Sequence, residues 1–436
     1  MSGQLKKILG PGFGIAIVIG GTIGVGILRT PGTIASQLPD LWLILLCWLV
    51  GGLIVLISSS SYAELAAMMP RAGGMYNYVR AAFGNFPGFL TGWFDYIVNA
   101  MPPAYYSIVI AEYLILVMPG LGEYRLAVEL SVLTFFMGMN LLGTQTGSIF
   151  QQVTSMLKVL FFLVLIIACF LWTPDATDTF HQVLEKRPEG GYLLAFFMAL
   201  QFVTGAYNGW WNAAVFAEED RDPGKNLPLS FFAGNLTVII IYVLINAALF
   251  HVIPVREAAG NPLVASQAAE IVFGRSGFIV MVIFALFTLI NILNAYMMIP
   301  ARILYGLSRD GFFLPAFTRV NNGGSPVPAL LFSFVFQVIL IVISSFDRLF
   351  SLGSFLGTII LGMAYCSVII LRKKMPDTPR PYKTWLYPWS TIVAILVSLA
   401  LIFFFSVNDR ISLVVTLILT LTAYPLYLWI RKINYK

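Results

Sequence analysis

Long apolar runs follow one another along almost the whole chain and leave no room between them for a soluble domain. A transmembrane helix needs roughly 20 predominantly apolar residues, and the pattern predicts twelve such segments. Their centres lie near Gly24, Val55, Ala104, Thr134, Val164, Gly205, Ile241, Leu289, Val335, Leu361, Val397 and Leu419. We therefore predict an all-α integral membrane protein, with a single membrane domain over residues 1–436.

The first apolar segment contains residues that interrupt helices. Residues 20–32 read GGTIGVGILRTPG, in which the glycines favour a break and Pro31 suits the first turn of a resumed helix. The sixth segment carries a comparable interruption, TGAYNGWWN at residues 204–212, at a similar depth but running in the opposite direction. Two antiparallel broken helices indicate an inverted repeat with a transport site near the bilayer midplane. The alternative is that these glycines only pack helices together.

The ends of such helix halves offer complementary charges. Where the second half of the first segment begins, near Val25, unpaired N–H groups and the positive end of the helix dipole suit a carboxylate. Carbonyls left free around Thr22 and residues 205–208 suit an ammonium group. A site with both features matches the backbone of a free α-amino acid, and neighbouring helices would then select the side chain.

Composition and charge agree with a membrane protein, because 59% of the residues are hydrophobic and only 11% are charged. Of the Lys and Arg residues, 17 fall on the side that holds both termini and 8 on the other, with Lys158 inside the fifth segment. The positive-inside rule then places both termini in the cytoplasm. The net charge of +6 thus indicates topology and not nucleic-acid binding, and the N-terminus is not expected to be a cleaved signal peptide. The three cysteines and two histidines show no disulfide, metal or cofactor spacing.

Three longer motifs carry a family resemblance. They read YAELAAMMPRAGGMYNYVRAAFG at residues 62–84, YNGWWNAAVFAEEDRDPGKNLP at residues 207–228 and PARILYGLSRDGFFLPAFTRVNNGGSPVPALL at residues 300–331. With these motifs, the chain resembles the amino acid–polyamine–organocation (APC) superfamily, and within it the L-type amino acid transporter group. The resemblance implies a twelve-span, LeuT-like five-plus-five inverted-repeat fold and transport of amino acids by alternating access. It implies a first repeat over about residues 1–175, a second over 190–372, and two additional helices over 385–436.

The motif GVGI in the first segment is similar to the GSGI of this family. The resemblance implies that Gly24, Val25 and Gly26 offer backbone N–H groups to the substrate carboxylate. Val25 stands where a Ser is common, so the backbone donors would carry more of the binding. In the sixth segment, Gly205 and Asn208 align with positions whose carbonyls receive the substrate ammonium group.

Many members of this family place an aromatic gate where this chain has Gly205. The resemblance therefore implies either a roomier pocket or a gate supplied by another residue, with Phe202, Tyr207 and Trp210 as candidates. Tyr207 is also a predicted substrate contact. Asn294 matches an Asn of the family that faces the site, and the alternative for it is a hydrogen bond between two helices.

Lys158 is the most informative ionisable residue, because an unpaired charge within a membrane span is costly. In the family that the chain resembles, a Lys in this part of the fifth span occupies the place of a bound sodium ion and touches the broken part of the first span. This implies a sodium-independent carrier. Two alternatives stay open: a proton-coupling role for Lys158, and snorkelling of its ammonium group to the cytoplasmic interface.

Asp95, Asn99, Glu112 and Glu64 are weaker candidates for lining the transport pathway. Glu64 belongs to the YAEL motif and is expected to tie a cytoplasmic loop. Asp95 is the one mid-span acid that would suit a cationic substrate, so a cationic amino acid or polyamine carrier is an alternative. The acidic run at residues 218–225 is expected to form a solvated face or an inner gate network.

These features predict a secondary transporter of amino acids in the plasma membrane, with a sodium-independent exchanger or carrier of neutral L-amino acids preferred over a proton-coupled symporter. The loop VMPGLGEYR lacks the cysteine through which animal L-type transporters attach a glycoprotein. We therefore expect no covalent accessory subunit and a bacterial inner-membrane location. An enzyme is not expected, because the spans lack a convergent catalytic set. A channel or a non-transporting amino acid receptor is the alternative from a different class.

Overall fold

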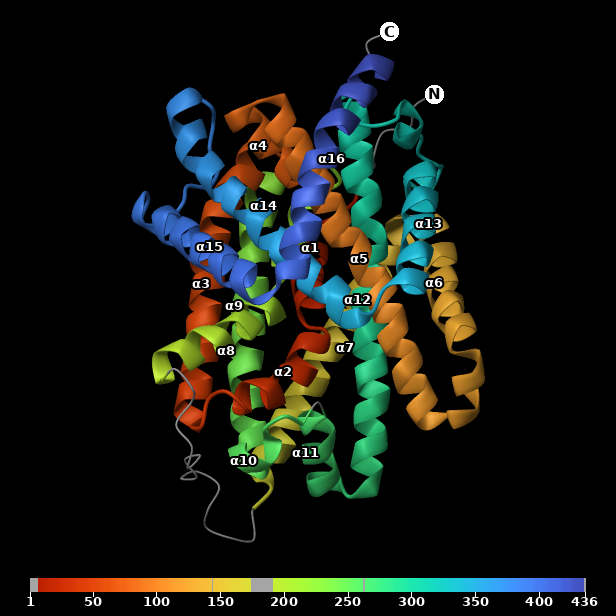
Figure 1. Cartoon of the computed structure of the whole chain (residues 1–436), viewed down its shortest axis with the longest axis vertical. Coiled ribbons are helices and arrows are strands. Elements are labelled where there is room, and N and C mark those ends of the chain that lie inside the picture. The colour runs from red at the N-terminus through yellow and green to blue at the C-terminus, as the bar shows by residue number, and fades with distance from the viewer. Residues whose placement is uncertain (1–6, 143, 174–190, 262, 435–436) are drawn as a thin grey trace.

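The computed structural model describes residues 7–142, 144–173, 191–261 and 263–434, which form a bundle of helices (Figure 1). These residues contain no β-strand, only an isolated bridge between Leu9 and Asp220. The boundary expected between the two repeats, residues 175–190, falls outside the described residues. The α-helices are α1 (Pro11–Thr22), α2 (Val25–Ala35), α3 (Leu41–Met68), α4 (Met75–Phe83), α5 (Asn85–Val117), α6 (Arg125–Leu141), α7 (Thr144–Leu171), α8 (Tyr192–Ala206), α9 (Pro223–Val252), α10 (Val255–Ala258), α11 (Val264–Phe273), α12 (Arg275–Arg309), α13 (Val327–Ile343), α14 (Phe346–Lys374), α15 (Trp389–Asn408) and α16 (Arg410–Asn434), and the 3-10 helices are η1 (Pro119–Tyr124), η2 (Trp210–Phe216) and η3 (Pro315–Thr318).

The first broken helix consists of α1 and α2, which are bent by 41° relative to each other. α1 ends at Thr22, and Gly24 has extended backbone angles (φ −141°, ψ −144°) before α2 starts at Val25. The break therefore lies within the glycine-rich stretch. The expectation for Pro31 is corrected: Pro31 lies inside α2 and not in its first turn, because the helix already resumes at Val25.

The second broken helix consists of α8 and η2. α8 ends at Ala206, and Gly209 follows with a φ of +103°, a conformation that side chains disfavour. Space also requires glycine there, because a Cβ at Gly209 would lie 2.5 Å from the carbonyl oxygen of Gly21. α1 contacts η2, while α2 contacts α8. The two broken helices therefore run antiparallel, with their breaks facing each other.

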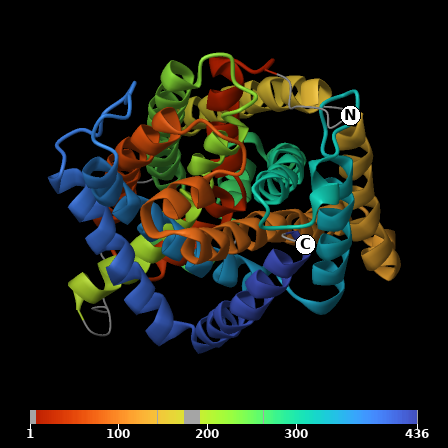
Figure 2. The ribbon, with the colours of Figure 1, turned by 90° about the horizontal axis from the view of Figure 1, so that it is seen from above.

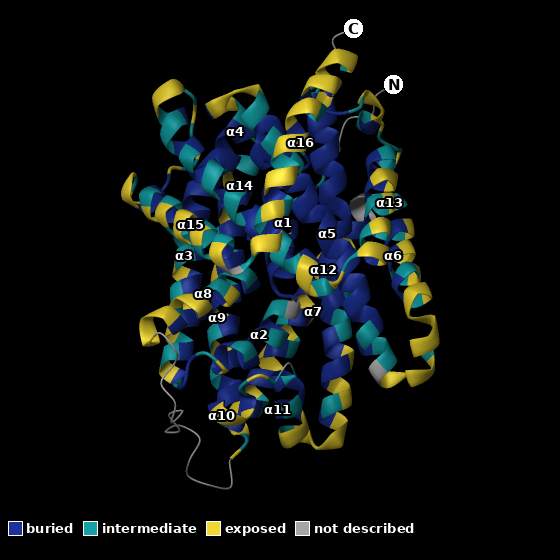
Figure 3. Cartoon of the chain, viewed as in Figure 1, coloured by how far each residue is buried: buried dark blue, intermediate teal, exposed yellow. Residues whose placement is uncertain are grey.

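Seven of the described helices are long and apolar enough to cross a membrane, and the bent pair α1–α2 raises the number to eight. The seven are α3, α7, α9, α12, α14, α15 and α16. Large apolar side chains such as Trp42 and Leu421 point outward, and Figure 3 shows exposed residues on the outside of a buried centre. Because an apolar exterior is stable only against lipid, the chain is a multi-pass membrane protein.

The broken helices are held against an aromatic core. Trp48 of α3, Tyr207 after α8 and Tyr242 of α9 are buried, with ring centroids 4.9–5.9 Å apart. Such edge-on and tilted ring pairs add to the stabilisation from burial. α15 and α16, in blue, lie along one outer side of the bundle in Figure 2. The centre of the molecule is thus formed around the two breaks.

Candidate functional site

A small cavity of about 40 Å³, which we call the first cavity, lies between the two breaks. Its walls come from α1, α2, α5, α8, η2, α12 and α14. Five of the residues expected to bind substrate line it: Thr22, Gly24, Gly26, Gly205 and Asn208. None of the described residues that line it carries a charge. The sequence thus indicated residues of the two breaks, whereas the lining residues of α5, α12 and α14 were not among the predicted contacts.

Gly24 and Gly26 bring the start of α2 close to its neighbours. A Cβ at Gly26 would lie 2.9 Å from the Cα of Ala206, and one at Gly24 would lie 2.6 Å from the Cδ1 of Ile292. Gly24 is the N-cap of α2, and no side chain caps this end. The first N–H groups of α2 therefore have no partner within the helix and can bind an anion such as a carboxylate.

The carbonyl groups of the two breaks meet at a single hydroxyl. The Oη atom of Tyr242 lies 3.0 Å from the carbonyl oxygens of both Thr22 and Ala206. A hydroxyl has one proton, so it cannot satisfy both oxygens fully at the same time. The Oγ1 atom of Thr22 is also buried without a hydrogen-bond partner in the described part of the chain. This edge of the cavity therefore has spare acceptors, as an ammonium group requires.

An aromatic cluster from α5 and α14 closes one side of the first cavity. Phe350 stacks on Phe346 with centroids 5.5 Å apart, and Tyr105 packs edge-on against both rings. A Cβ at Gly205 would lie 3.8 Å from the ring of Phe350. The ring nearest to Gly205 is thus supplied by α14, a position that the sequence did not indicate.

The three gate candidates named from sequence lie elsewhere. Phe202 is 39% exposed on the outside of α8. The hydroxyl of Tyr207 donates to the carbonyl of Trp48 at 3.2 Å, which directs it away from the first cavity. Trp210 packs edge-on against Tyr62, with centroids 5.6 Å apart. Neither Tyr207 nor Trp210 lines the first cavity.

Tyr106, Tyr296 and Trp211 also line the first cavity. A Cβ at Gly24 would lie 3.2 Å from the Oη of Tyr106, and a Cβ at Gly209 would lie 2.6 Å from the Oη of Tyr296. Sequence reasoning missed both tyrosines, because aromatic residues in a membrane bundle usually serve packing and no spacing marks the exceptions.

Lys158 is fully buried in α7 and reaches the first break. Its Nζ donates to the carbonyl of Ile23 at 2.7 Å and to that of Gly20 at 3.4 Å. No carboxylate forms an ion pair with it among the described residues. The ammonium group is therefore turned inward to the helix break and does not snorkel to the interface.

Asn294 joins helices instead of lining the first cavity. Its Nδ2 donates to the carbonyl of Gly147 at 3.3 Å and to the Oε1 of Gln151 at 3.1 Å, both on α7. Asp95 is also absent from the lining, and its Oδ1 accepts a 2.8 Å hydrogen bond from the Nδ2 of Asn99 one turn away. These contacts tie α12 to α7 and fix side chains within α5.

Glu112 lies near the end of α5, where it pairs with two arginines. Its carboxylate is 3.5 Å from Arg29 and 3.0 Å from Arg125, and all three side chains are partly exposed. Such exposed pairs contribute little stability. Glu112 therefore lies at the solvent edge and not at the first cavity.

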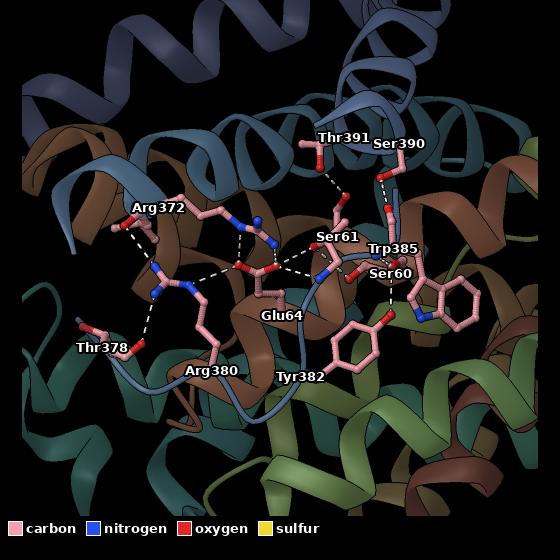
Figure 4. Close-up of polar contacts among 12 residues, drawn as sticks. Ser60, Ser61, Glu64, Arg372, Thr378, Arg380, Tyr382, Trp385, Ser390 and Thr391 are labelled. Carbon is pink, nitrogen blue, oxygen red and sulfur yellow. Dashed lines mark hydrogen bonds and ion pairs between the residues drawn. The ribbon is translucent and has the colours of Figure 1, made fainter. Parts of the chain in front are cut away.

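Glu64 anchors the segment that follows α14 (Figure 4). Arg372 donates to both of its carboxylate oxygens, at 2.9 and 2.6 Å, and Arg380 forms an ion pair with it at 3.2 Å. The amide and hydroxyl of Thr384 donate to the same carboxylate at 2.8 and 2.7 Å. A bidentate Arg pair with further donors holds a buried carboxylate firmly. Glu64 thus ties α3 to α14 and to the loop, as the sequence predicted.

The acidic run at residues 218–225 forms a network and not only a solvated face. Glu219 and Arg302 are both buried and form an ion pair at 3.1 Å, which joins the end of η2 to α12. Glu218 pairs with Arg309 and accepts a 3.0 Å hydrogen bond from the amide of Ala72. Burial raises the pKa of Asp220 next to this network. The described residues contain no group of His, Cys, Asp and Glu that could hold a metal ion.

Comparison with known proteins decides the family. Residues 14–428 match the family model described as amino acid permease. The chain belongs to the amino acid permease family. This confirms the resemblance to the APC superfamily that the three motifs carry.

Curated relatives match this permease over nearly its whole length. It is 29% identical to the serine/threonine exchanger SteT of Bacillus subtilis, over 98% of each chain. It is 29% identical to the mouse b(0,+)-type amino acid transporter 1, over 92% of the permease and 82% of the relative. It is 28% identical to the mouse large neutral amino acids transporter small subunit 2, over 97% and 81%. The family and these relatives are transporters, so the permease is an amino acid transporter.

Proposed function

We propose that the permease is a sodium-independent exchanger of neutral L-amino acids that works by alternating access. The observation that carries this proposal is the first cavity, which lies between two helix breaks and whose described lining holds no charged side chain. Free N–H groups at the start of α2 would hold the substrate carboxylate, and the carbonyls near Tyr242 would hold its ammonium group. A charged substrate side chain would be buried there without a partner, which is costly.

Sodium independence is supported by the position of Lys158. In broken-helix transporters, unwound carbonyls coordinate the coupling cation. Here the ammonium group of Lys158 contacts two carbonyls of the first break, those of Gly20 and Ile23. A tethered cation at this position makes a bound sodium ion unnecessary and disfavours one by charge repulsion.

The proposal includes the twelve-span, LeuT-like topology with both termini in the cytoplasm of a bacterium. The breaks of the first and sixth spans face each other in antiparallel helices, which supports an inverted repeat. We assign the first repeat to residues 1–175, the second to 190–372 and two additional helices to 385–436, within one membrane domain. The bacterial inner membrane and the absence of a covalent accessory subunit belong to the same proposal, since the loop containing η1 has no cysteine.

Uptake of labelled amino acids into sodium-free proteoliposomes, with and without unlabelled amino acids inside, tests this function. We expect uptake of neutral amino acids only into preloaded vesicles. Uptake into empty vesicles that rises with an inward proton gradient would establish a proton-coupled symporter instead. Uptake of cationic amino acids or polyamines would refute the choice of substrate, and binding without flux would indicate a receptor.

A further inference from the structure

A second cavity of about 50 Å³ lies on the other side of the second break, among α3, α8, α14 and α15. Gly205 and Asn208 line both this cavity and the first cavity. At Gly205 the wall between them consists of backbone alone. A Cβ there would be in ordinary van der Waals contact with the ring of Phe350, at 3.8 and 3.9 Å. The two cavities therefore adjoin at the backbone of Gly205 and at Asn208.

The second cavity offers several hydroxyl acceptors from three of the helices around it. The hydroxyls of Thr204, Thr358 and Ser398 line it, and each donates its proton to a carbonyl of its own helix at 2.9–3.0 Å. A hydroxyl that donates in this way keeps its lone pairs free to accept. The rest of the wall combines apolar residues such as Val55 and Leu361 with the polar residues Ser58, Asn208, Trp210 and Tyr365, and none of the described lining residues is charged. The surface suits a neutral group that donates a hydrogen bond.

We propose that the second cavity receives the substrate side chain and selects a neutral side chain that ends in an O–H or N–H donor, such as a hydroxyl or carboxamide. This inference rests on the proposed function, because the first cavity must hold the amino and carboxyl groups. The first cavity is small and walled by aromatic rings, so a side chain longer than a methyl group leaves it past Gly205. The hydroxyl acceptors of the second cavity then discriminate against a side chain of equal size without a donor.

Filling the second cavity tests where the side chain lies. Ala394 of α15 lines the second cavity but not the first, and it is buried. In proteoliposomes preloaded with alanine, labelled alanine exchange is competed with unlabelled glutamine or alanine. For Ala394→Leu we expect glutamine to compete about tenfold more weakly, while competition by alanine changes much less. The matched control is Val393→Leu, a similar enlargement at a neighbouring residue that is 43% exposed on the outside of α15.

Removing one acceptor tests the chemistry of selection. Thr358→Val keeps the shape of the side chain and deletes the hydroxyl that faces the second cavity. Threonine and valine are competitors of nearly equal shape that differ in one donor. We expect the preference for threonine over valine to fall by roughly three- to tenfold, which corresponds to one hydrogen bond. Thermal stabilisation of the detergent-solubilised permease by the same two amino acids should show the same loss.

The outcomes separate the two proposals. Two results together support a second cavity that receives the substrate side chain. Glutamine alone competes more weakly in Ala394→Leu, and the preference for threonine over valine is smaller in Thr358→Val. If competition by alanine and by glutamine weakened equally in Ala394→Leu, or if neither changed, the role of the second cavity would be overturned. The proposed exchange of neutral amino acids would still stand. Failure of the unsubstituted permease to exchange any neutral amino acid would refute the proposed function, and the inference with it. Gel filtration of each variant shows whether it is folded.

Discussion

Gly26 lies so close to Ala206 that no side chain fits between them. A Cβ there would lie 2.9 Å from the Cα of Ala206, so a larger residue must push the two broken helices apart. We expect Gly26→Leu to abolish amino acid binding, measured as loss of ligand-induced thermal stabilisation, while the variant still elutes as a folded protein. Gly138→Leu is the control, because a Cβ at this helical glycine meets nothing within 4 Å. Normal binding by Gly26→Leu would remove the basis for a site between the breaks.

Lys158 supplies the one ammonium group that contacts the first break within the described chain. Lys158→Met keeps the length of the side chain but leaves the carbonyl of Ile23 without its 2.7 Å donor. We expect at least roughly tenfold slower exchange with near-normal expression, because an unpaired buried carbonyl destabilises the broken segment.

The control for Lys158 is Lys374→Met, which removes a lysine that also donates to a carbonyl, that of Ala82, but far from the breaks. This variant should exchange amino acids at nearly the normal rate. Unchanged flux in Lys158→Met would show that its ammonium group is dispensable for transport.

Among single residues, the sequence predicted those whose role depends on backbone conformation or on charge. It missed those whose role depends on how the helices pack. Gly24 and Gly26 could be found because two glycine-containing interruptions occur in antiparallel spans, and Lys158 because a charge there is costly. Phe350 could not be found, because an aromatic residue on α14 is indistinguishable in sequence from ordinary lipid-facing or core residues. Which ring lies beside Gly205 depends on how α14 packs, and spacing alone does not determine that.

The two broken helices are joined through α9. The hydroxyl of Tyr242 lies 3.0 Å from the carbonyl oxygen of Thr22 and 3.0 Å from that of Ala206. We expect Tyr242→Phe to weaken the apparent affinity for substrate by about three- to tenfold, since one net hydrogen bond and its positioning of both breaks are lost. Competition assays in proteoliposomes measure this effect.

Tyr62→Phe is the control for Tyr242, because the hydroxyl of Tyr62 is buried in the same core without a hydrogen-bond partner in the described residues. It should leave the affinity close to normal. If both substitutions behaved alike, the bridge between the breaks would have no role in binding.

At the scale of elements, the first break was predicted correctly, but the position of Pro31 within the resumed helix was wrong. The predicted start near Val25 agrees with the start of α2, whereas Pro31 lies inside α2 and not in its first turn. A proline is tolerated inside α2 although it removes one backbone donor, so it is a weak marker of a helix start. The second break was found from TGAYNGWWN, but its continuation as the 3-10 helix η2 depends on packing against α1.

The topology of the whole molecule makes a prediction about access from each side of the membrane. Gly120 of η1 lies in a loop expected outside the cell, and Asp377 in the segment after α14 lies in one expected inside. In intact cells, a membrane-impermeant maleimide should label Gly120→Cys and not Asp377→Cys. Permeabilised cells provide the control, in which both are labelled, and the opposite pattern would invert the topology.

The all-helical, multi-pass character of the chain was more predictable from sequence than its inner connections. Apolar periodicity and the Lys/Arg bias follow from the bilayer itself, so they can be recognised without a structure. The hydrogen-bond network of Glu64 joins it to residues more than 300 positions further along the chain, such as Arg372 and Thr384. Of this network, only Glu64 belongs to a recognisable motif. Its partners could not be predicted, because they depend on how α14 and the following loop fold back onto α3.

The ammonium group of Lys158 at the first break also affects how transport depends on the membrane potential. A sodium ion bound with the substrate would cross the bilayer, and each elementary charge moved gains or loses about 2.3 kcal/mol per 100 mV. The ammonium group of Lys158 is covalently attached and leaves with neither substrate. Exchange of one zwitterion for another then moves no net charge, so the membrane potential neither drives nor opposes it. The direction of net flux would follow only the concentrations of amino acids on the two sides.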